Sequence, residues 1–417
     1  MNRYTKAALL AGASTLAAGA ALADAHAACD LGTGNVRILG NDFGAIHAVV
    51  DRAMECTTEG EITANLTTEH KEIQVAALTA DPTEYTVAIV ANSSLVPLLN
   101  GGLVRPLNDL VEAHGDSLSD LQLIRVGDDI VAVAFMANAQ HLFYREDVLA
   151  EAGVEVPTTY EEVIAAGQAI RDAGIMEHPV ALNTMTGWNL GEEFINMYLG
   201  YGGEFFAPGT AEVSIDNEAG MKALETLKAL TELSNPDFLT FDSNATGALW
   251  EAGNVALATM WGSRGAGILD DEGSSEEVVA ATKLAGAPTV GGGSQPATTL
   301  WWDGFTIAQN ISDEDAEASF KAMVHGVAPE VLETEGNAEL AVWLIEGYEP
   351  TPAAQGVAQS AQAGAMPYPM LPYMGLLHTA LGDELADFLQ GKESAEQALD
   401  DVEAAYTTAA KEQGFLQ

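Results

Sequence analysis

Positive charge is scarce in this sequence. The 417 residues contain 16 Lys and Arg against 61 Asp and Glu, a formal net charge of −45. A surface of this sign repels phosphate backbones and anionic lipid headgroups, so the composition argues against a nucleic-acid partner and against docking on an anionic membrane. The acidity selects no ligand by itself, because a solvated surface in a saline exterior has the same composition.

Cysteine is almost absent. The chain contains 2, Cys29 and Cys56, both near the N-terminus. In an oxidising compartment a close, even pair predicts a disulfide, which here would join the segment before the first predicted strand to the end of the first predicted helix. The alternative is a lipid on Cys29, although residues 26–28 lack the Leu expected before such a cysteine. With so few thiols, no HExxH motif and no clustered His, we expect neither a metal site nor a cofactor.

Long hydrophobic runs are missing beyond the N-terminus. Arg3 and Lys6 precede an uncharged run of small apolar residues, Ala7 to Ala23, which ends in the Ala-Leu-Ala cleavage pattern. These features predict a signal peptide over residues 1–23. No later stretch approaches the eighteen apolar residues of a membrane span. We therefore expect an exported, soluble, periplasmic protein.

The chain is longer than one hydrophobic core normally fills, which favours two lobes. Strand, polar loop and helix alternate along its first hundred residues, a pattern typical of a parallel α/β sheet. Ligands bind beyond the carboxyl ends of such strands. Asn41 and Asp42 follow a predicted strand at 36–39, and Asn92 follows another at 87–90. These three are candidate ligand contacts, with ordinary turn formation as the alternative.

Residues 157–162, Pro-Thr-Thr-Tyr-Glu-Glu, predict the start of a helix over 161–173. Pro157 stops the helix from extending backward. Thr158 or Thr159 can cap it, and the acidic first turn complements the helix dipole.

Four stretches stand out along the chain: LNGGLVRPL (99–107), LFYREDVLAEAGV (142–154) with PTTYEE (157–162), WEAGNVAL (250–257) and DFLQGKESAEQAL (387–399). They resemble motifs of the carbohydrate-type extracellular solute-binding proteins of ABC importers, a group similar to maltose-binding protein. They follow one another in that family's order over nearly the whole chain after the signal peptide.

The resemblance implies an α/β fold of the two-lobed periplasmic-binding-protein type. Each lobe would be a mainly parallel sheet flanked by helices, with a ligand cleft between the lobes. The chain would cross between lobes three times, so that residues 29–138 and 304–350 form lobe 1 and residues 139–303 and 351–417 form lobe 2.

A sugar site needs aromatic planes for C–H faces and planar polar groups for hydroxyls. The resemblance places Asn138 beside a crossing, with a hinge hydrogen bond as the alternative role. Trp188 precedes a predicted helix and could equally pack in the core. Tyr373 ends a Pro-rich stretch that resembles a cleft loop of the family, and a structural role is its alternative.

Residues 261–264 read Trp-Gly-Ser-Arg where the family often has Asn-Gly-Pro-Trp, whose aromatic ring stacks on sugar. Trp261 and Arg264 are therefore both candidates. A guanidinium can pair bidentately with a carboxylate, so an acidic sugar or a polyol gains weight over a neutral oligosaccharide. The alternative is that Arg264 pairs with one of the protein's own acidic residues.

Two adjacent tryptophans, Trp301 and Trp302, precede an alternating pattern that predicts a strand through Phe305 and Ile307. Neighbouring side chains on a strand point to opposite faces. We expect Trp302 and Asp303 to contact the ligand and Trp301 to pack in the core.

The sequence therefore predicts a non-enzymatic, monomeric binding protein that closes around a sugar, acidic sugar or polyol and delivers it to a membrane permease. The alternative is a polyamine or betaine held by aromatic rings with Asp42 and Asp303, against which Arg264 argues. A hydrolase is disfavoured, because 61 acidic residues produce carboxylate pairs by chance and no G-x-S-x-G or P-loop motif occurs.

Overall fold

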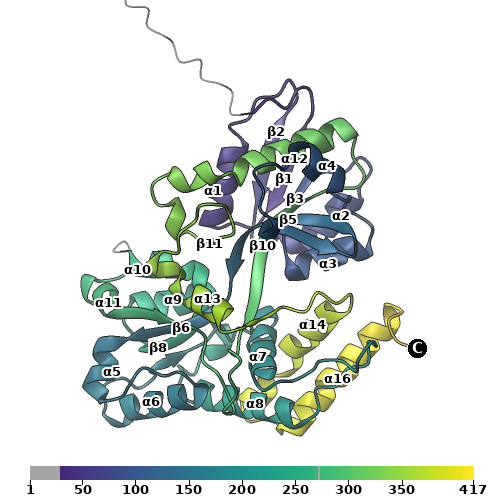
Figure 1. The fold of residues 1–417 in the computed structure, drawn as a ribbon. Helices are drawn as coiled ribbons and strands as arrows, with labels where there is room; N and C mark the ends of the chain where they lie inside the picture. Colours follow the sequence, from purple (N-terminus) through teal and green to yellow (C-terminus); the bar gives the residue numbers. More distant parts are fainter. Residues whose placement is uncertain (1–28, 271–272) are drawn as a thin grey trace, which may run out of the picture.

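The structure, a computed structural model, describes residues 29–270 and 273–417. The predicted signal peptide, 1–23, lies outside the described residues. The chain forms two lobes, each with its own β-sheet and flanking helices (Figure 1). The predicted two-lobed α/β fold is confirmed. In the part of the chain that the structure describes, no helix is long and apolar enough to cross a membrane.

The first lobe is built on the larger sheet. The sequence of β3, Val-Ala-Ile-Val-Ala, is apolar throughout, and all of its residues are buried. Such a continuous apolar run suits a central strand, which is covered on both faces. In spatial order the sheet contains β11 (Val342–Trp343), β5 (Asp129–Asn138), β10 (Thr299–Ile307), β3 (Val87–Ala91), β1 (Val36–Gly40) and β2 (Ile62–Leu66), with β4 (Leu123–Val126) beside β5 and β12 (Met366–Pro367) beside β10.

Helices cover both faces of this sheet. Ser312 caps α12 by accepting a hydrogen bond from the Asp315 N–H (3.1 Å), and three acidic residues follow in the first turn, where the helix dipole favours them. α12 packs on α1, and between them and the sheet lie Ile38, Phe305 and Phe320. The helices are α1 (Gly44–Ala53), α2 (His70–Thr79), α3 (Asn92–Asn100), α4 (Asn108–His114) and α12 (Asp313–Gly326).

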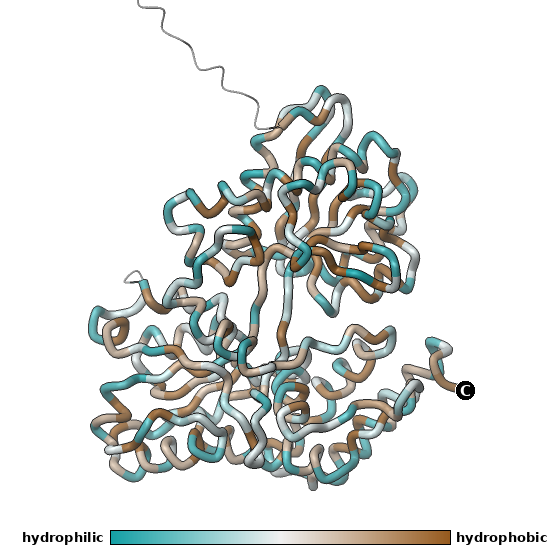
Figure 2. Tube along the Cα trace, in the orientation of Figure 1, coloured by the Kyte–Doolittle hydropathy of each residue, from teal (hydrophilic) through white to brown (hydrophobic). Residues whose placement is uncertain are grey.

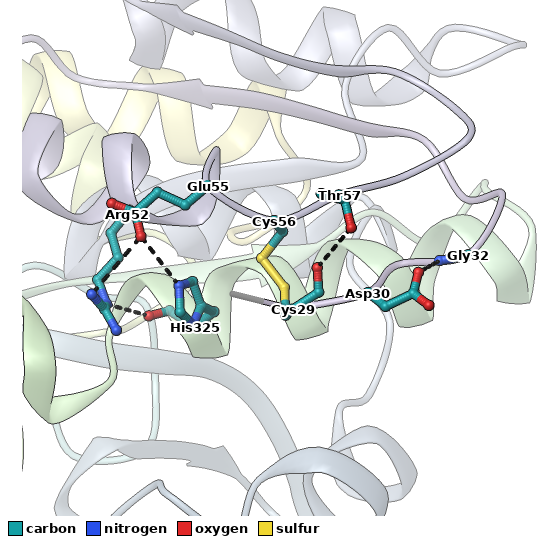
Figure 3. The surroundings of a disulfide bond; sticks show 8 residues. All are labelled: Cys29, Asp30, Gly32, Arg52, Glu55, Cys56, Thr57 and His325. Atoms are coloured by element: carbon teal, nitrogen blue, oxygen red, sulfur yellow. Dashed lines mark hydrogen bonds and ion pairs between the residues drawn. A yellow bond between two sulfur atoms is a disulfide. The ribbon is translucent and has the colours of Figure 1, made fainter. Parts of the chain in front are cut away.

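The predicted disulfide is confirmed. Cys29 and Cys56 are bonded, with their Cα atoms 4.6 Å apart (Figure 3). Two backbone hydrogen bonds run beside it, from Thr57 N to Cys29 O and from Leu31 N to Thr57 O, both 2.8 Å. Because Sγ of Cys29 is used in this bond, the lipid-modified alternative does not fit the structure.

The second lobe is built on a smaller sheet in the order β7-β8-β6-β9. Its α6 begins at the predicted capping residue, since Thr159 Oγ1 accepts a hydrogen bond from Glu162 N (3.1 Å) and the Glu162 carboxylate accepts one from Thr159 N. The strands are β6 (Gln140–Arg145), β7 (Val180–Ala181), β8 (Leu257–Trp261) and β9 (Thr282–Ala285). The helices are α5 (Glu146–Ala152), α6 (Tyr160–Asp172), α7 (Trp188–Gly200), α8 (Glu218–Thr231), α9 (Ser243–Glu251), α10 (Gly265–Leu269), α11 (Glu276–Ala281), α13 (Gln355–Gln362), α14 (Met374–Glu384), α15 (Ala386–Leu389) and α16 (Ala395–Glu412), with short 3-10 turns η3 (Gly262–Arg264) and η6 (Pro352–Ala354).

Extended segments join the lobes. β5 ends at Asn138 and β6 begins at Gln140, so the chain passes from one sheet to the other within a residue. β10 makes the return crossing, pairing with β12 at its start and with β3 at its end. These links are visible between the two lobes, whose apolar residues lie mostly inside (Figure 2).

Both sheets are mixed, which corrects the prediction of mainly parallel sheets. In the first, β1 is parallel to β2 and β3, but β10 is antiparallel to both β3 and β5. In the second, β7 and β8 are parallel while β6 is antiparallel to β8 and β9. The reason is the crossing connection, because a strand that returns from the other lobe enters the sheet against the direction of its neighbours.

Candidate functional site

A cavity of about 470 Å³ lies between the lobes, where the crossing strands run. We call it the interlobe cavity. Both lobes and both crossing strands contribute to its wall, as expected of a site that opens and closes by hinge motion. Seven of the predicted ligand contacts line it: Asn41, Asp42, Asn138, Trp188, Trp261, Arg264 and Asp303. That they touch a solute stays a prediction.

Tryptophans form one wall of the interlobe cavity. The ring of Trp188 is stacked near Trp261 (6.1 Å between centroids, 29°), and Trp301 meets both edge-on at 5.4 and 5.9 Å. These separations lie in the range that aromatic pairs prefer. We call these three residues the tryptophan cluster. It offers a rigid apolar surface of the kind that the C–H face of a sugar needs.

His378 supports the tryptophan cluster from behind. Its ring stacks on Trp188 at 4.9 Å, and its Nε2 lies 2.8 Å from the Trp188 carbonyl oxygen. Because that oxygen can only accept, Nε2 carries the hydrogen and Nδ1 accepts from the Tyr368 hydroxyl (2.9 Å). Burial lowers the pKa of His378 to about 4, so this neutral form persists at neutral pH.

Trp301 packs in the second-lobe core, as predicted, where it is 5% exposed, but it also borders the cavity, which was not predicted. Its indole N–H donates to Glu192 (2.9 Å) and Thr299 (2.8 Å). Trp302 lies on the opposite face of β10 and packs against the apolar interior of the first lobe. Trp302 does not border the interlobe cavity, so the structure gives no support to its predicted ligand contact. Strand alternation also explains why Asp303, two residues from Trp301, lines the cavity.

Glu192 fixes the position of the Trp301 ring. It is fully buried in α7 and accepts hydrogen bonds from the Trp301 indole and the Thr299 hydroxyl. Burial raises its pKa to about 8, against the opposing effects of these bonds and of Lys71. The carboxyl is therefore mostly protonated at neutral pH.

Lys71 and Asp303 face the interlobe cavity with unused hydrogen-bonding capacity. The Lys71 ammonium lies 4.6 Å from the Trp188 ring centroid. Its side chain is accessible from the cavity, yet desolvation by surrounding protein lowers its pKa, while Asp303 and Glu192 raise it. Desolvation raises the pKa of Asp303 to about 6, with Lys71 opposing. Within residues 29–270 and 273–417, neither makes a hydrogen bond or ion pair with another side chain.

Arg264 lies in η3, on the second-lobe wall of the interlobe cavity. The alternative role, pairing with one of the protein's own carboxylates, is not realised among the described residues, where Arg264 has no ion pair or hydrogen bond. Desolvation lowers its pKa, and the more distant Asp242 and Glu251 raise it. The guanidinium thus borders the cavity with its donors free.

The polar residues from the first lobe and the crossing already have partners. Asn41 accepts a hydrogen bond from Asp42 N (2.8 Å), the turn contact named as its alternative role, and Asp42 pairs with His47 (2.7 Å). Asn138 holds Ser263 by accepting from its N–H (3.3 Å) and donating to its hydroxyl (3.2 Å). Asn138 therefore joins the end of β5 to η3 and also borders the cavity, and its hinge role stays a prediction.

Two predicted contacts lie elsewhere. Tyr373 donates its hydroxyl hydrogen to Thr210 O (2.6 Å) and packs on Phe206 and Phe415 within the second lobe. Asn92 is buried and does not border the interlobe cavity. Neither side chain borders the interlobe cavity, so the structure gives no support to these two predicted ligand contacts.

Asn92 fastens β10 to the start of α3. Its side chain accepts from Trp302 N (2.9 Å) and donates to Leu300 O (3.3 Å). We expect Asn92→Ala to lower the free energy of unfolding by about 1–3 kcal/mol, because buried backbone groups lose their partners. Urea unfolding measures this. Asn100→Ala, at the exposed end of the same helix, is the control and should change it by less than about 0.5 kcal/mol; equal effects would contradict the fastening role.

Sequence reasoning missed Lys71, Trp301, Ser243 and Asn244, which all border the interlobe cavity. Lys71 sits at an ordinary exposed helix start, and only the approach of the second lobe turns that position into a cavity wall. No cluster of three or more His, Cys, Asp or Glu side chains suited to a metal ion occurs in the described residues.

Comparison with known proteins decides the family. The bacterial extracellular solute-binding protein family matches residues 68–324, more than half of the chain. The chain belongs to this family. A curated relative of the solute-binding protein, the probable ABC transporter-binding protein of Deinococcus radiodurans, is 25% identical over 207 residues, 48% of this chain and 47% of its own length. The chain thus spans about half the length of that relative.

Solved structures support the fold of the solute-binding protein. The ABC transporter solute-binding protein of Agrobacterium radiobacter K84, in complex with ribitol, superposes with a TM-score of 0.78 at 19% identity, over 91% of this chain and 100% of that chain. The maltose-bound MalE3 of T. maritima gives 0.74 at 16% identity, over 90% and 100%. At these identities the similarity establishes the two-lobed fold.

Proposed function

We propose that this protein is the solute-binding component of an ABC importer, and that it captures a sugar or polyol in the interlobe cavity and delivers it to the membrane permease. The observation that carries the proposal is that the tryptophan cluster, Lys71 and Asp303 line one cavity together. The proteins of similar fold hold ribitol and maltose, which supports the same solute class here.

The chemistry of a hydroxyl fits the open pair of charges. A hydroxyl can accept a hydrogen bond from the Lys71 ammonium and donate one to the Asp303 carboxylate. A row of such groups with a C–H face on the tryptophan cluster describes a sugar or polyol. Affinity then comes from hydrogen bonds to charged partners in a site from which water is expelled.

The proposed motion is a hinge closure. Residues 29–138 with 304–350 would move as one lobe against residues 139–303 with 351–417. Closure would bring Asn41 and Asp42 toward a solute resting on the tryptophan cluster. The hydrogen bonds of Asn138 with Ser263, beside the crossing, would hold the pivot.

A polyamine or betaine fits the cavity less well. The Lys71 ammonium already lies over the Trp188 ring, where a cationic solute would bind, and Arg264 adds a second positive charge to the lining of the cavity. A cation would therefore meet like charges.

The proposal extends to the cellular setting. The protein would act without catalysis, as a monomer, in the periplasm after removal of residues 1–23. The N-terminal sequence of the exported protein, its mass in solution and an assay for turnover of the bound solute test these three points.

A ligand panel tests the function. Ribitol, mannitol, maltose, spermidine and glycine betaine would be added to the purified protein in a thermal-shift assay, followed by calorimetry on any hit. A ligand at about a hundred times its Kd stabilises the folded state by about 2.7 kcal/mol, a readily visible shift. Stabilisation by spermidine or betaine alone would contradict the proposal.

Solute affinity should depend on pH through Asp303. The solute hydroxyls would bind the ionised carboxylate, whose pKa is about 6 in the free protein. As pH falls through 6 the ionised fraction drops, so the affinity should be about tenfold weaker at pH 5 than at pH 7 and nearly constant above pH 7. Calorimetry at these pH values measures it. Asp303→Asn should bind weakly with a flat profile, and a pH dependence that survives in this variant would contradict the assignment.

A further inference from the structure

We infer that the preferred solute is a sugar acid and that Arg264 is the residue that binds its carboxylate. This inference rests on the proposed function and narrows its substrate class. The carboxylate would take the guanidinium in a two-point contact, while the hydroxyl groups use Lys71 and Asp303.

The first support is that Arg264 has no partner in a protein rich in possible partners. Acidic residues outnumber basic ones 61 to 16. Arg52, Arg105 and Arg145 each pair with a carboxylate within 4.0 Å. Arg264 is partly buried, yet among the described residues it has no such pair. Its donors border the cavity, where a carboxylate of the solute could accept hydrogen bonds from two of them at once.

The second support is that nearby carboxylates are held away from Arg264. Asp242 raises the pKa of Arg264 from a distance, but its side chain accepts a hydrogen bond from Ala245 N (2.8 Å) as the cap of α9. Glu251, at the other end of α9, also raises the pKa of Arg264 without forming an ion pair with it. Neither carboxylate therefore occupies the guanidinium of Arg264.

The third support is the fixed position of the Arg264 backbone. Ser263 is held by Asn138, and a Cβ on Gly262 would lie 2.2 Å from Val357 Cγ2. On the other side, a Cβ on Gly265 would lie 2.9 Å from the Ala353 carbonyl oxygen. The turn is thus packed tightly against η6 and the start of α13, so its backbone loses little freedom when a solute binds Arg264.

The cavity wall also carries two carboxylates. Asp42 lies within hydrogen-bond distance of His47, and Asp303 lies in the field of Lys71. Arg264 is the cation that the second-lobe wall offers to a carboxylate of the solute. The acidic outer surface acts weakly here, because charges more than about 8 Å away are screened at physiological ionic strength.

The test compares matched solutes on matched variants. Ribonate and ribitol, gluconate and sorbitol, and glucuronate and glucose differ within each pair in a carboxylate alone. Calorimetry at pH 7.5 and physiological ionic strength would give their affinities for the wild type, for Arg264→Gln and for Arg125→Gln. The last variant removes the same charge from an exposed strand position away from the cavity.

We expect the acid of at least one pair to bind the wild type about 10- to 100-fold more tightly than its neutral counterpart. Arg264→Gln should abolish that preference while the neutral member keeps its affinity within about threefold. Arg125→Gln should leave both unchanged.

Neutral members binding as well as the acids, or Arg264→Gln weakening both equally, would overturn the inference and leave the proposed function intact. If no sugar, polyol or sugar acid binds the folded wild type, the proposed function itself fails.

Discussion

Trp188→Ala is expected to weaken solute binding by about 30- to 150-fold. The ring faces the interlobe cavity, stacks near Trp261 and lies under the Lys71 ammonium. Its removal deletes the centre of the apolar wall, and the Lys71 ammonium also loses the ring over which it lies. Buried aromatic anchors of this kind contribute about 2–3 kcal/mol to binding, which gives the stated loss. Calorimetry with the best ligand of the panel measures it.

Trp302→Ala is the matched control. This side chain is equally large but lies on the far side of β10 from the cavity, against the hydrophobic cluster of the first lobe that includes Leu95 and Val131. Its loss should lower the midpoint of thermal unfolding, because a cavity opens in the first lobe. The folded variant should keep its affinity within about twofold. Unchanged affinity in Trp188→Ala, or a large loss in Trp302→Ala, would contradict the assignment of the two faces.

The sequence contains the local features of this fold. The start of α6 depends on a capping box between Thr159 and Glu162, and these contacts span three residues. The predicted helix over 161–173 therefore agrees with the observed Tyr160–Asp172 within a residue. The cysteine pair was also predictable, because 2 cysteines in an exported chain have one partner each.

Features that depend on how the lobes meet could not be predicted. Alternation along β10 places Trp301 and Trp302 on opposite faces, but both faces of a crossing strand can be covered, so the pattern does not say which residue borders the cavity. The antiparallel position of β10 between β3 and β5 also depends on how the chain crosses between the lobes. Lys71 joins the site because the second lobe lies opposite the start of α2, and nothing in its neighbourhood in the sequence marks that approach.

Removing the disulfide is expected to destabilise the protein by about 3–4 kcal/mol. Cys29 and Cys56 close a loop with a sequence separation of 27, and loop-closure entropy in the unfolded chain gives this value. The loss acts on the first lobe, where the bond ties the segment before β1 to the end of α1. Urea unfolding of a Cys29→Ser, Cys56→Ser variant measures the change.

Reductant provides the matched control for this variant. The chain has no further cysteine, so a reducing agent should lower the stability of the wild type to that of the variant and leave the variant unchanged. Neither cysteine borders the interlobe cavity, so the folded variant should bind solute with an affinity within about twofold of the wild type. Equal stability of the oxidised and reduced wild type would show that the bond constrains a segment that adds nothing to the first lobe. A large loss of affinity in the folded variant would contradict this independence and show that the disulfide influences the cavity wall of the first lobe.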